Sequence, residues 1–273
     1  MNRVKKIFKR AERIVIGVIH FPPLIGYPKF PGLDVALQNA LKDLRAFERG
    51  GVDGIMFENN YDIPHREQVD PGVVAAMTYL GGALRSEMSL PLGVSVLWND
   101  YRAALGIAKV LGLEFVRIPV FVDKVSTDYG VFMGVAREAR QYRKHIMADD
   151  VAILADVHVK HARLLSKASL ETSATRAVAA GADALILTGH RTGVPPDEEE
   201  VGRVREAVGR FPIFIGSGVT TGNARSLLKY SNGVIVSTSL KRGGIKSGEI
   251  NVKSYTQRID AKKVRTLVSQ VKP

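Results

Sequence analysis

Cysteine is absent from this chain of 273 residues. Its absence excludes disulfides, thiolate metal sites and cysteine nucleophiles, and suits a cytoplasmic protein. No apolar run is long enough to span a membrane, and the basic N-terminus lacks the apolar core and cleavage site of a signal peptide. Glutamine is scarce beside abundant Arg, Lys and Glu, a balance typical of thermophile proteins. We therefore expect a soluble cytoplasmic protein.

Acidic residues are too few to balance the basic ones. The chain has 27 Asp and Glu against 39 Lys and Arg, a formal net charge of +12. Much of this excess lies near the two ends, in residues 3–10 and 262–265. A basic excess attracts polyanions, but no basic stretch is interleaved with the aromatic residues on which single-stranded nucleic acid stacks. We expect a solvated surface and anionic small molecules as partners, rather than nucleic acid.

Linkers and breaks in composition are also missing, so nothing divides the chain into two domains. Eight apolar runs cover residues 13–20, 54–60, 92–99, 115–121, 151–159, 184–190, 213–219 and 233–239. Helical patterns alternate with them at residues 35–49, 72–87, 101–111, 130–146, 170–180, 198–209, 221–230 and 261–271. This alternation predicts one closed parallel eight-stranded α/β barrel, the (β/α)8 TIM barrel, over residues 1–273. Residues 1–12 form a basic N-terminal extension, and residues 245–273 a C-terminal extension with the last helix.

Two of the loops that follow strands are longer than a connection needs. They cover residues 21–34, rich in Pro and Gly, and residues 122–130, which are mostly polar. Long loops on this side of a barrel are often lids. We expect both to reach over the barrel mouth.

Ionisable side chains gather at the ends of the apolar runs. In residues 151–161, VAILADVHVKH, strand alternation puts Asp156, His158 and Lys160 on one face and only apolar residues on the other. The same alternation selects the other residues that point into the mouth. These are His20, Glu58, Ser95, Asn99, Arg117, Thr188, His190, Ser217, and Ser237 or Ser239. Each one alone is explained as a solvated barrel end, but the whole set predicts a ligand site, since burying unpaired ionisable groups is costly.

Two glycine- and serine-rich stretches follow the last two predicted strands, IGSGVT at 215–220 and STSLKRGG at 237–244. Loops at these positions form the recurrent phosphate site of such barrels, because backbone N–H groups can approach an anion there. Ordinary turn chemistry is the alternative. The residues expected to hold the phosphate are Gly216, Ser217, Gly218, Ser237, Ser239 and Lys241.

Several longer motifs carry a family resemblance. They are GVIHFPPLIGYP (17–28), GGVDGIMFEN (50–59), AAMT (75–78), LPLGVSVLWND (90–100), ILADVHVKHA (153–162), LILTGHRTGVPPD (185–197), GSGVT (216–220) and GVIVSTSLKR (233–242). In this order they resemble the BtpA/SgcQ family from about residue 16 to residue 242. The resemblance implies a barrel of the ribulose-phosphate-binding kind. One branch of that family is linked to photosystem I biogenesis and another to sugar-uptake gene clusters, and neither link fixes a reaction.

The first functional interpretation is an enzyme acting on a phosphorylated small molecule, such as a sugar phosphate or a nucleotide. Acid/base chemistry needs ionisable groups that face the reacting atoms. Lys160 can form a Schiff base, but its place beyond the end of its strand favours a solvated lysine. The catalytic candidates are Asp156, His158, Glu58, His20 and Lys160. Further candidates for binding the substrate are Asn99, Arg117 and His190.

Two other interpretations stay open. Metal-assisted hydrolysis is one, with Glu58, Asp156 and His158 as candidate ligands of a divalent ion. Against it, the barrel hydrolases used for comparison place two histidines on the first strand, where this chain has His20 alone. The other is a non-enzymatic assembly or stabilising factor, which the ionisable mouth disfavours. No cofactor is assigned, and a homo-oligomer is left open.

Overall fold

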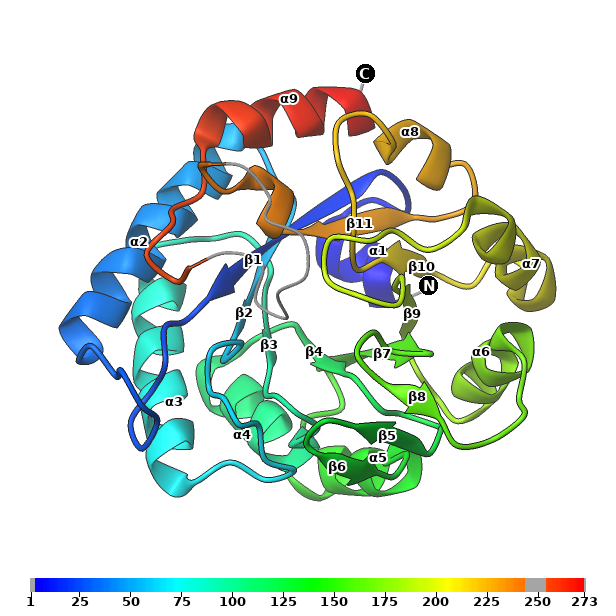
Figure 1. The fold of residues 1–273 in the computed structure, drawn as a ribbon, viewed down its shortest axis with the longest axis horizontal. Helices are drawn as coiled ribbons and strands as arrows, with labels where there is room; N and C mark the ends of the chain where they lie inside the picture. The colour runs from blue at the N-terminus through cyan, green and yellow to red at the C-terminus, as the bar shows by residue number, and fades with distance from the viewer. Residues whose placement is uncertain (1–2, 244–253, 273) are drawn as a thin grey trace.

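Eight parallel strands close into a barrel, as the alternation of strands and helices predicts. The computed structural model describes residues 3–243 and 254–272 (Figure 1). The strands are β1 (Ile14–His20), β2 (Gly54–Glu58), β3 (Leu92–Ser95), β4 (Phe115–Ile118), β7 (Ala152–Val157), β9 (Ala184–Leu187), β10 (Ile213–Ile215) and β11 (Gly233–Val236). Around the barrel they neighbour one another in the order β1-β11-β10-β9-β7-β4-β3-β2. The TIM-barrel prediction is confirmed.

Helices surround the strands as an outer ring (Figure 1). They are α2 (Leu33–Gly50), α3 (Pro71–Ser86), α4 (Tyr101–Leu111), α5 (Ala136–His145), α6 (Leu170–Ala179), α7 (Glu198–Val208), α8 (Ala224–Leu227) and α9 (Ala261–Val271). The apolar residues that gave the helical period face inward; Leu44 and Phe47 of α2, for example, are fully buried. Their apolar faces and the outward faces of the strands form one hydrophobic layer.

Glycines in the left-handed conformation end two of these helices. Gly51 follows α2 with φ 82°, and its N–H donates to the carbonyls of Phe47 and Glu48. Gly112 ends α4 with φ 62°. The left-handed conformation suits glycine because a Cβ would be strained there. The glycines thus turn the chain back toward β2 and β4.

The amino end of the barrel is closed by α1 (Arg3–Phe8), which lies in the N-terminal extension. Val4 and Phe8 are buried, and the Phe8 ring centroid lies 5.7 Å from that of Phe115 and 6.3 Å from that of Phe214. Arg3 pairs with Asp183 at 2.9 Å. The extension therefore carries apolar packing as well as positive charge.

A small antiparallel sheet stands beside the barrel mouth. Its strands are β5 (Val125–Thr127), β6 (Gly130–Phe132) and β8 (Arg163–Leu164), in the order β6-β5-β8. The helix predicted over residues 130–146 is therefore wrong in its first residues, because Gly130, at φ 120°, completes the turn between β5 and β6. That helix, α5, begins only at Ala136.

The other long loop, residues 21–34, does not reach over the mouth. Phe21 and Leu24 are buried, and the N–H of Leu24 donates to Asp62 Oδ1 at 2.7 Å. The loop runs outward toward α2 and α3 (Figure 1). Its buried apolar residues pack at the rim of the barrel, so the expectation of a lid is wrong for this loop.

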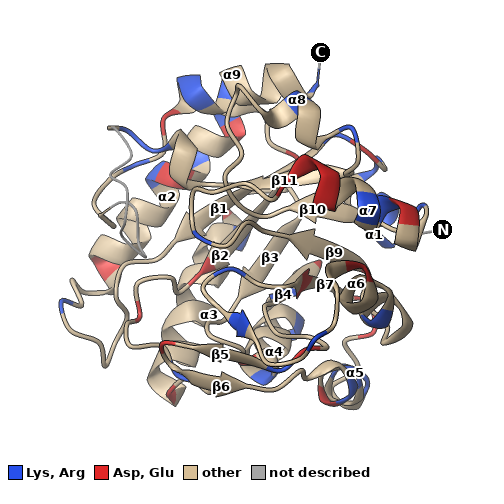
Figure 2. Cartoon of the chain, turned by 45° about the vertical axis from the view of Figure 1, so that its right-hand side comes forward, with Lys and Arg blue, Asp and Glu red and all other residues tan. Residues whose placement is uncertain are grey.

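Charged side chains lie largely on the outer helices (Figure 2). Lys and Arg occupy several sides of the molecule, while α7 begins with Glu198, Glu199 and Glu200. Among the described helices, none is both long enough and apolar enough to cross a membrane.

Candidate ligand site at the carboxyl end of the barrel

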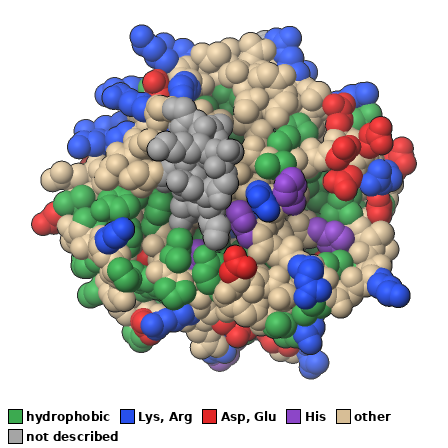
Figure 3. Space-filling view, viewed as in Figure 1, with side chains coloured by type: hydrophobic (Ala, Val, Ile, Leu, Met, Phe, Trp, Pro, Cys, Tyr) green, Lys and Arg blue, Asp and Glu red, His purple; other side chains and the backbone are tan. Residues whose placement is uncertain are grey.

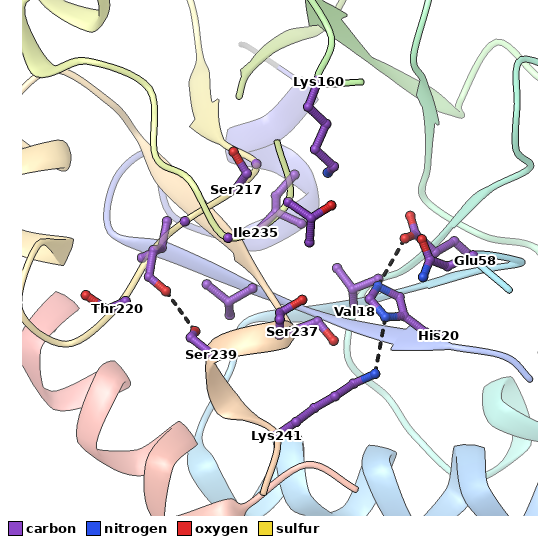
Figure 4. A pocket seen from close by; sticks show the side chains of 18 of the residues that line it. Val18, His20, Glu58, Lys160, Ser217, Thr220, Ile235, Ser237, Ser239 and Lys241 are labelled. Atoms are coloured by element: carbon purple, nitrogen blue, oxygen red, sulfur yellow. Dashed lines mark hydrogen bonds and ion pairs between the residues drawn. The ribbon is translucent and has the colours of Figure 1, made fainter. Parts of the chain in front are cut away.

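A pocket opens where the carboxyl ends of the strands meet their loops (Figure 4). On the same side of the molecule, histidine and basic side chains lie close together near the centre (Figure 3). Lining residues that the sequence predicted are His20, Glu58, Arg117, Lys160, Gly216, Ser217, Gly218, Ser237, Ser239 and Lys241. Those it did not predict are Val18, Asn60, Tyr61, Thr192, Gly193, Val219, Thr220, Ile235, Val236 and Thr238. The pocket thus joins ionisable groups to the glycine- and serine-rich loops.

His20 connects a carboxylate to an ammonium group. Its Nε2 lies 3.0 Å from Glu58 Oε1, and its Nδ1 lies 3.5 Å from Lys241 Nζ. Because an ammonium group only donates, Nδ1 accepts and the ring proton sits on Nε2, which donates to Glu58. Burial, and then the charge of Lys241, lower the pKa of His20. The imidazole is therefore neutral at pH 7.

Glu58 is held in its ionised form. Burial alone would raise the pKa of Glu58, but the hydrogen bond from His20 and the charge of Arg117 outweigh it, and the pKa falls to about 2. Glu58 Oε2 lies 3.6 Å from Arg117 Nη1 and makes no hydrogen bond to the described residues. One carboxylate oxygen is thus fixed by His20, while the other keeps unused acceptor capacity.

Arg117 and Asp156 form a bidentate ion pair below this group. Arg117 Nε and Nη2 each lie 2.8 Å from one oxygen of Asp156. Burial alone would lower the pKa of Arg117, but Asp156 outweighs it and the pKa is raised. The pair forms because β4 and β7 are neighbours in the barrel. Asp156 does not line the pocket, since both of its oxygens are bound to Arg117.

Lys160 projects into the pocket from the segment after β7 (Figure 4). Its backbone N–H donates to Thr188 Oγ1 at 2.9 Å, whereas its Nζ has no hydrogen bond or ion pair within residues 3–243 and 254–272. Burial, and then the charge of Arg117, lower the pKa of Lys160 to about 8. Lys160 is therefore not the freely solvated lysine that its position past the strand favoured.

Gly218 and Val219, in the loop after β10, line the pocket. Gly218 has φ 66°, and a Cβ there would lie 2.0 Å from Pro195 N, so only glycine fits. A Cβ on Gly216 would lie 2.5 Å from Ile186 Cγ2. The N–H groups of Gly218 and Val219 have no hydrogen-bond partner in the described structure. Unpaired N–H groups of a turn are the usual elements of an anion site.

The serine hydroxyls around this loop differ in their availability. Ser217 Oγ donates to the carbonyl of Val194 at 2.8 Å, and Ser239 Oγ donates to that of Val219 at 2.7 Å. These two protons hold loops together and are already used. Ser237 Oγ is buried and has no partner among the residues described. Ser237 is thus the hydroxyl of the three whose hydrogen-bonding capacity is unused.

The predicted placement of Asp156 and His158 on one face is wrong. His158 has φ 50°, so the extended backbone ends at Val157 and strand alternation no longer holds. His158 Nε2 lies 3.1 Å from Ser173 Oγ on α6, and Ser173 donates to Asp123 at 3.0 Å. His158 therefore packs between β7 and α6, outside the pocket.

Asn99 and His190 also lie outside the pocket. Asn99 Nδ2 donates to the carbonyl of Val120 at 3.0 Å, and its Oδ1 accepts the N–H of Val120 at 2.8 Å, which ties together the ends of β3 and β4. His190 is exposed, and its backbone carbonyl accepts the N–H of His161 at 3.1 Å. Both follow the last extended residue of their strand, so alternation does not apply to them.

The three candidate metal ligands are not brought together. Arg117 stands between Glu58 and Asp156, at 3.6 Å from one and 2.8 Å from the other, and His158 faces α6. Across the described residues no group of three His, Asp or Glu side chains is arranged to hold a metal ion. Metal-assisted hydrolysis therefore has no ligand set at these three positions.

Tyr61 is a pocket residue that the sequence analysis missed. Lys241 Nζ donates to its hydroxyl at 3.3 Å and lies 5.5 Å from its ring centroid. Tyr61 thus orients the ammonium group that contacts His20. The sequence could have indicated Tyr61 as a pocket residue, because it lies soon after Glu58 in the loop that follows β2.

Solved structures with the same fold have low sequence identity to this chain. N-(5′-phosphoribosyl)anthranilate isomerase from Pyrococcus furiosus superposes with a TM-score of 0.57 at 13% identity, over 95% of this chain and 98% of that one. A structure described as native KDPGal superposes with a TM-score of 0.52 at 16% identity, over 94% and 93%. At such identities the likeness shows the fold alone.

Sequence relatives are much more similar. The photosystem I biogenesis protein BtpA of Synechocystis sp. is 42% identical over 233 residues, which span 84% of this chain and 81% of that protein. An uncharacterised protein of Archaeoglobus fulgidus is 39% identical over 262 residues, 96% of this chain and 99% of that protein. The model of the BtpA family matches residues 11–273. The chain belongs to the BtpA family.

Proposed function

We propose that this protein is an enzyme that binds a phosphorylated small molecule in the pocket and transfers a proton on it. The observation that carries the proposal is the juxtaposition, in one pocket, of unpaired N–H groups at Gly218 and Val219 with the amine of Lys160. The first group is suited to a phosphate and the second to acid/base chemistry.

The charge of the site supports an anionic ligand. Arg117, Lys160 and Lys241 are cationic when protonated, and Glu58 and Asp156 are anionic, which leaves one positive charge in excess. Because Arg117 is neutralised by Asp156, the excess belongs to the two lysines. A phosphate held by the backbone N–H groups and Ser237 would balance that charge.

Lys160 is the proposed proton carrier. Its pKa of about 8 lies close to neutral pH, where a general acid/base is most effective because both forms are populated. Its Nζ makes no bond to the described residues that a substrate would have to displace. Glu58, ionised and fixed by His20, would stabilise positive charge that develops next to it.

A solved structure with the same fold supports a phosphorylated substrate. The isomerase from Pyrococcus furiosus, by its name, acts on a phosphoribosyl compound, and it has the same barrel. Its 13% identity carries no residue roles to this chain.

An assembly factor is the second candidate. It is favoured by the relative from Synechocystis, whose name assigns it to photosystem I biogenesis. A scaffold has no need for a half-buried lysine whose amine has no partner in the described residues, so the pocket favours an enzyme. The two candidates differ in whether the pocket binds a small molecule.

Thermal unfolding in the presence of inorganic phosphate and ribose 5-phosphate tests the proposal. Ribose 5-phosphate at 100 times its Kd should stabilise the protein by about 2.7 kcal/mol. Ser237→Ala should weaken binding, whereas Ser89→Ala, an exposed serine ahead of β3 at the opposite end of the barrel, should not. If no phosphorylated compound stabilises the wild type at millimolar concentration, the proposal fails.

A further inference from the structure

A second compartment adjoins the pocket beside the β5–β6 hairpin. Glu58, Asn60, Arg117, Lys160 and Thr192 line both spaces. The two compartments therefore meet at the ionisable centre of the site. The Lys160 side chain is unbranched and its Nζ is bonded to nothing in the described chain, so it can move aside for a ligand that extends across both.

Rings form much of the wall of this second compartment, which we call the ring compartment. His65, Trp98, Tyr129 and His161 line it. The rings of His65 and Tyr129 pack edge to face, with centroids 4.9 Å apart. The ring centroid of Trp98 lies 5.2 Å from that of Phe132 in β6. Rings held by such packing present flat apolar surfaces in a fixed orientation. These surfaces suit a planar ring better than a flexible chain.

The ring compartment also contains polar atoms that can form hydrogen bonds to a ligand. His65 is 7% exposed, and its Nδ1 is buried with no hydrogen-bond partner in the described residues. A buried polar atom of this kind is rare unless a water or a ligand completes it. Asp128, in the hairpin turn, adds a carboxylate acceptor.

The imidazoles in this wall are uncharged. Burial lowers the pKa of His65 to about 4, and burial with the charge of Lys160 lowers that of His161 to about 4. The N–H of Thr192 donates to His161 Nε2 at 3.2 Å, which places the ring proton of His161 on Nδ1. Two neutral imidazoles beside a carboxylate favour a neutral ring with N–H groups over an anionic one.

We infer that the ring compartment binds a neutral heteroaromatic ring of the substrate, as in a nucleoside monophosphate. The inference rests on the proposed function, because a phosphate at Gly218 and Ser237 occupies one end of the ligand. The ring occupies the other end, between Trp98 and Tyr129. The linking part then lies against Lys160, where the proton is transferred.

Binding of matched ligands tests the ring compartment. Calorimetry compares ribose 5-phosphate, the four common ribonucleoside 5′-monophosphates and adenosine, using the wild-type protein. At least one nucleotide should bind about tenfold more tightly than ribose 5-phosphate, the advantage expected from stacking on fixed rings. Tyr129→Leu should remove that advantage and leave the affinity for ribose 5-phosphate unchanged. Tyr79→Leu, which alters an exposed tyrosine on α3, is the matched control.

The outcomes separate the two proposals. If ribose 5-phosphate binds and no nucleotide binds more tightly, the ring inference is overturned and the phosphate site stands. An advantage that survives both Tyr129→Leu and His65→Leu would also overturn it, because the ring then lies elsewhere. If adenosine binds as tightly as its monophosphate and ribose 5-phosphate does not bind, the phosphate site fails. The inference then falls with the proposed function.

Discussion

The two ends of the barrel are filled in opposite ways. At the amino end, α1 inserts Val4 and Phe8 between apolar side chains, and the Phe8 ring contacts Phe115 and Phe214. At the carboxyl end, Glu58 is buried and Lys160 half-buried, and both have hydrogen-bonding capacity that the described residues do not satisfy. Apolar filling stabilises the fold at no cost in unpaired groups, whereas the ionisable end loses stability unless something binds there.

The difference assigns stability to one end and ligand binding to the other. Substitutions at the amino end should change the free energy of unfolding without changing affinity. At the carboxyl end, the buried pair between Arg117 and Asp156 should behave as part of the fold, and Lys160 as part of the site.

Arg117→Leu should destabilise the protein by about 3–5 kcal/mol, because it leaves Asp156 buried without its partner. Denaturant unfolding measures the loss. The double substitution Arg117→Leu with Asp156→Leu is the control, and it should recover part of the stability since no charge is left unpaired. Equal losses in the single and double variants would show that the charge pair is not the cause.

Phe8→Ala should cost about 3 kcal/mol in the free energy of unfolding, because it empties space between Phe115 and Phe214. The affinity for ribose 5-phosphate should stay at its wild-type value. A lower affinity in the folded variant would mean that the two ends are coupled, against the division proposed here.

Lys160→Met should lower turnover of an identified substrate at least about 100-fold, the usual contribution of a general acid/base. Stability should not fall, because the substitution removes a half-buried amine that has no partner in the described residues. Lys167→Met, at an exposed position before α6, is the control for loss of one positive charge. Full activity in the Lys160 variant would remove Lys160 from the mechanism.

The stability of the wild type should rise relative to Lys160→Met between about pH 8 and pH 10. The folded pKa of Lys160 is about 8, below the ordinary lysine value of about 10.4. In this window the unfolded chain binds more protons than the folded one, so unfolding becomes less favourable as pH rises. Denaturant midpoints for both proteins at several pH values measure the difference. Parallel pH profiles would contradict the burial of this amine.

His158→Ala should have the smallest effect, within about 1 kcal/mol of stability, from loss of the contact with Ser173. Turnover should be unchanged because His158 lies outside the pocket. A tenfold loss of turnover in this variant would restore the role that strand alternation first gave it.

The helices and strands were predictable from the sequence, because the spacings of apolar residues are local signals. The eight strands and their order followed from them, and so did the glycine loop at Gly216–Gly218. The ion pair between Arg117 and Asp156 was also consistent with the predicted fold, since the two residues lie on neighbouring strands. The sequence therefore predicted side-chain positions well where the backbone is extended or helical.

The positions of the other candidate site residues depend on backbone conformations that the sequence pattern does not predict. His158 and His161 have positive φ without being glycine, so alternation placed His158 on the wrong face. The hairpin around Gly130 spans the end of the predicted polar loop of residues 122–130 and the start of the predicted helix of residues 130–146, so neither prediction revealed it or the ring wall to which Tyr129 belongs. Such non-local packing cannot be derived from periodicity.

The aromatic packing of α1 has a consequence for the order in which the chain assembles. Phe8 is translated more than two hundred residues before its partner Phe214. Contacts of such long sequence separation form late in folding. The first helix must therefore wait, with its apolar face uncovered, until β10 has been synthesised. Nascent chains that stop before β10 should expose that face and be recognised by chaperones.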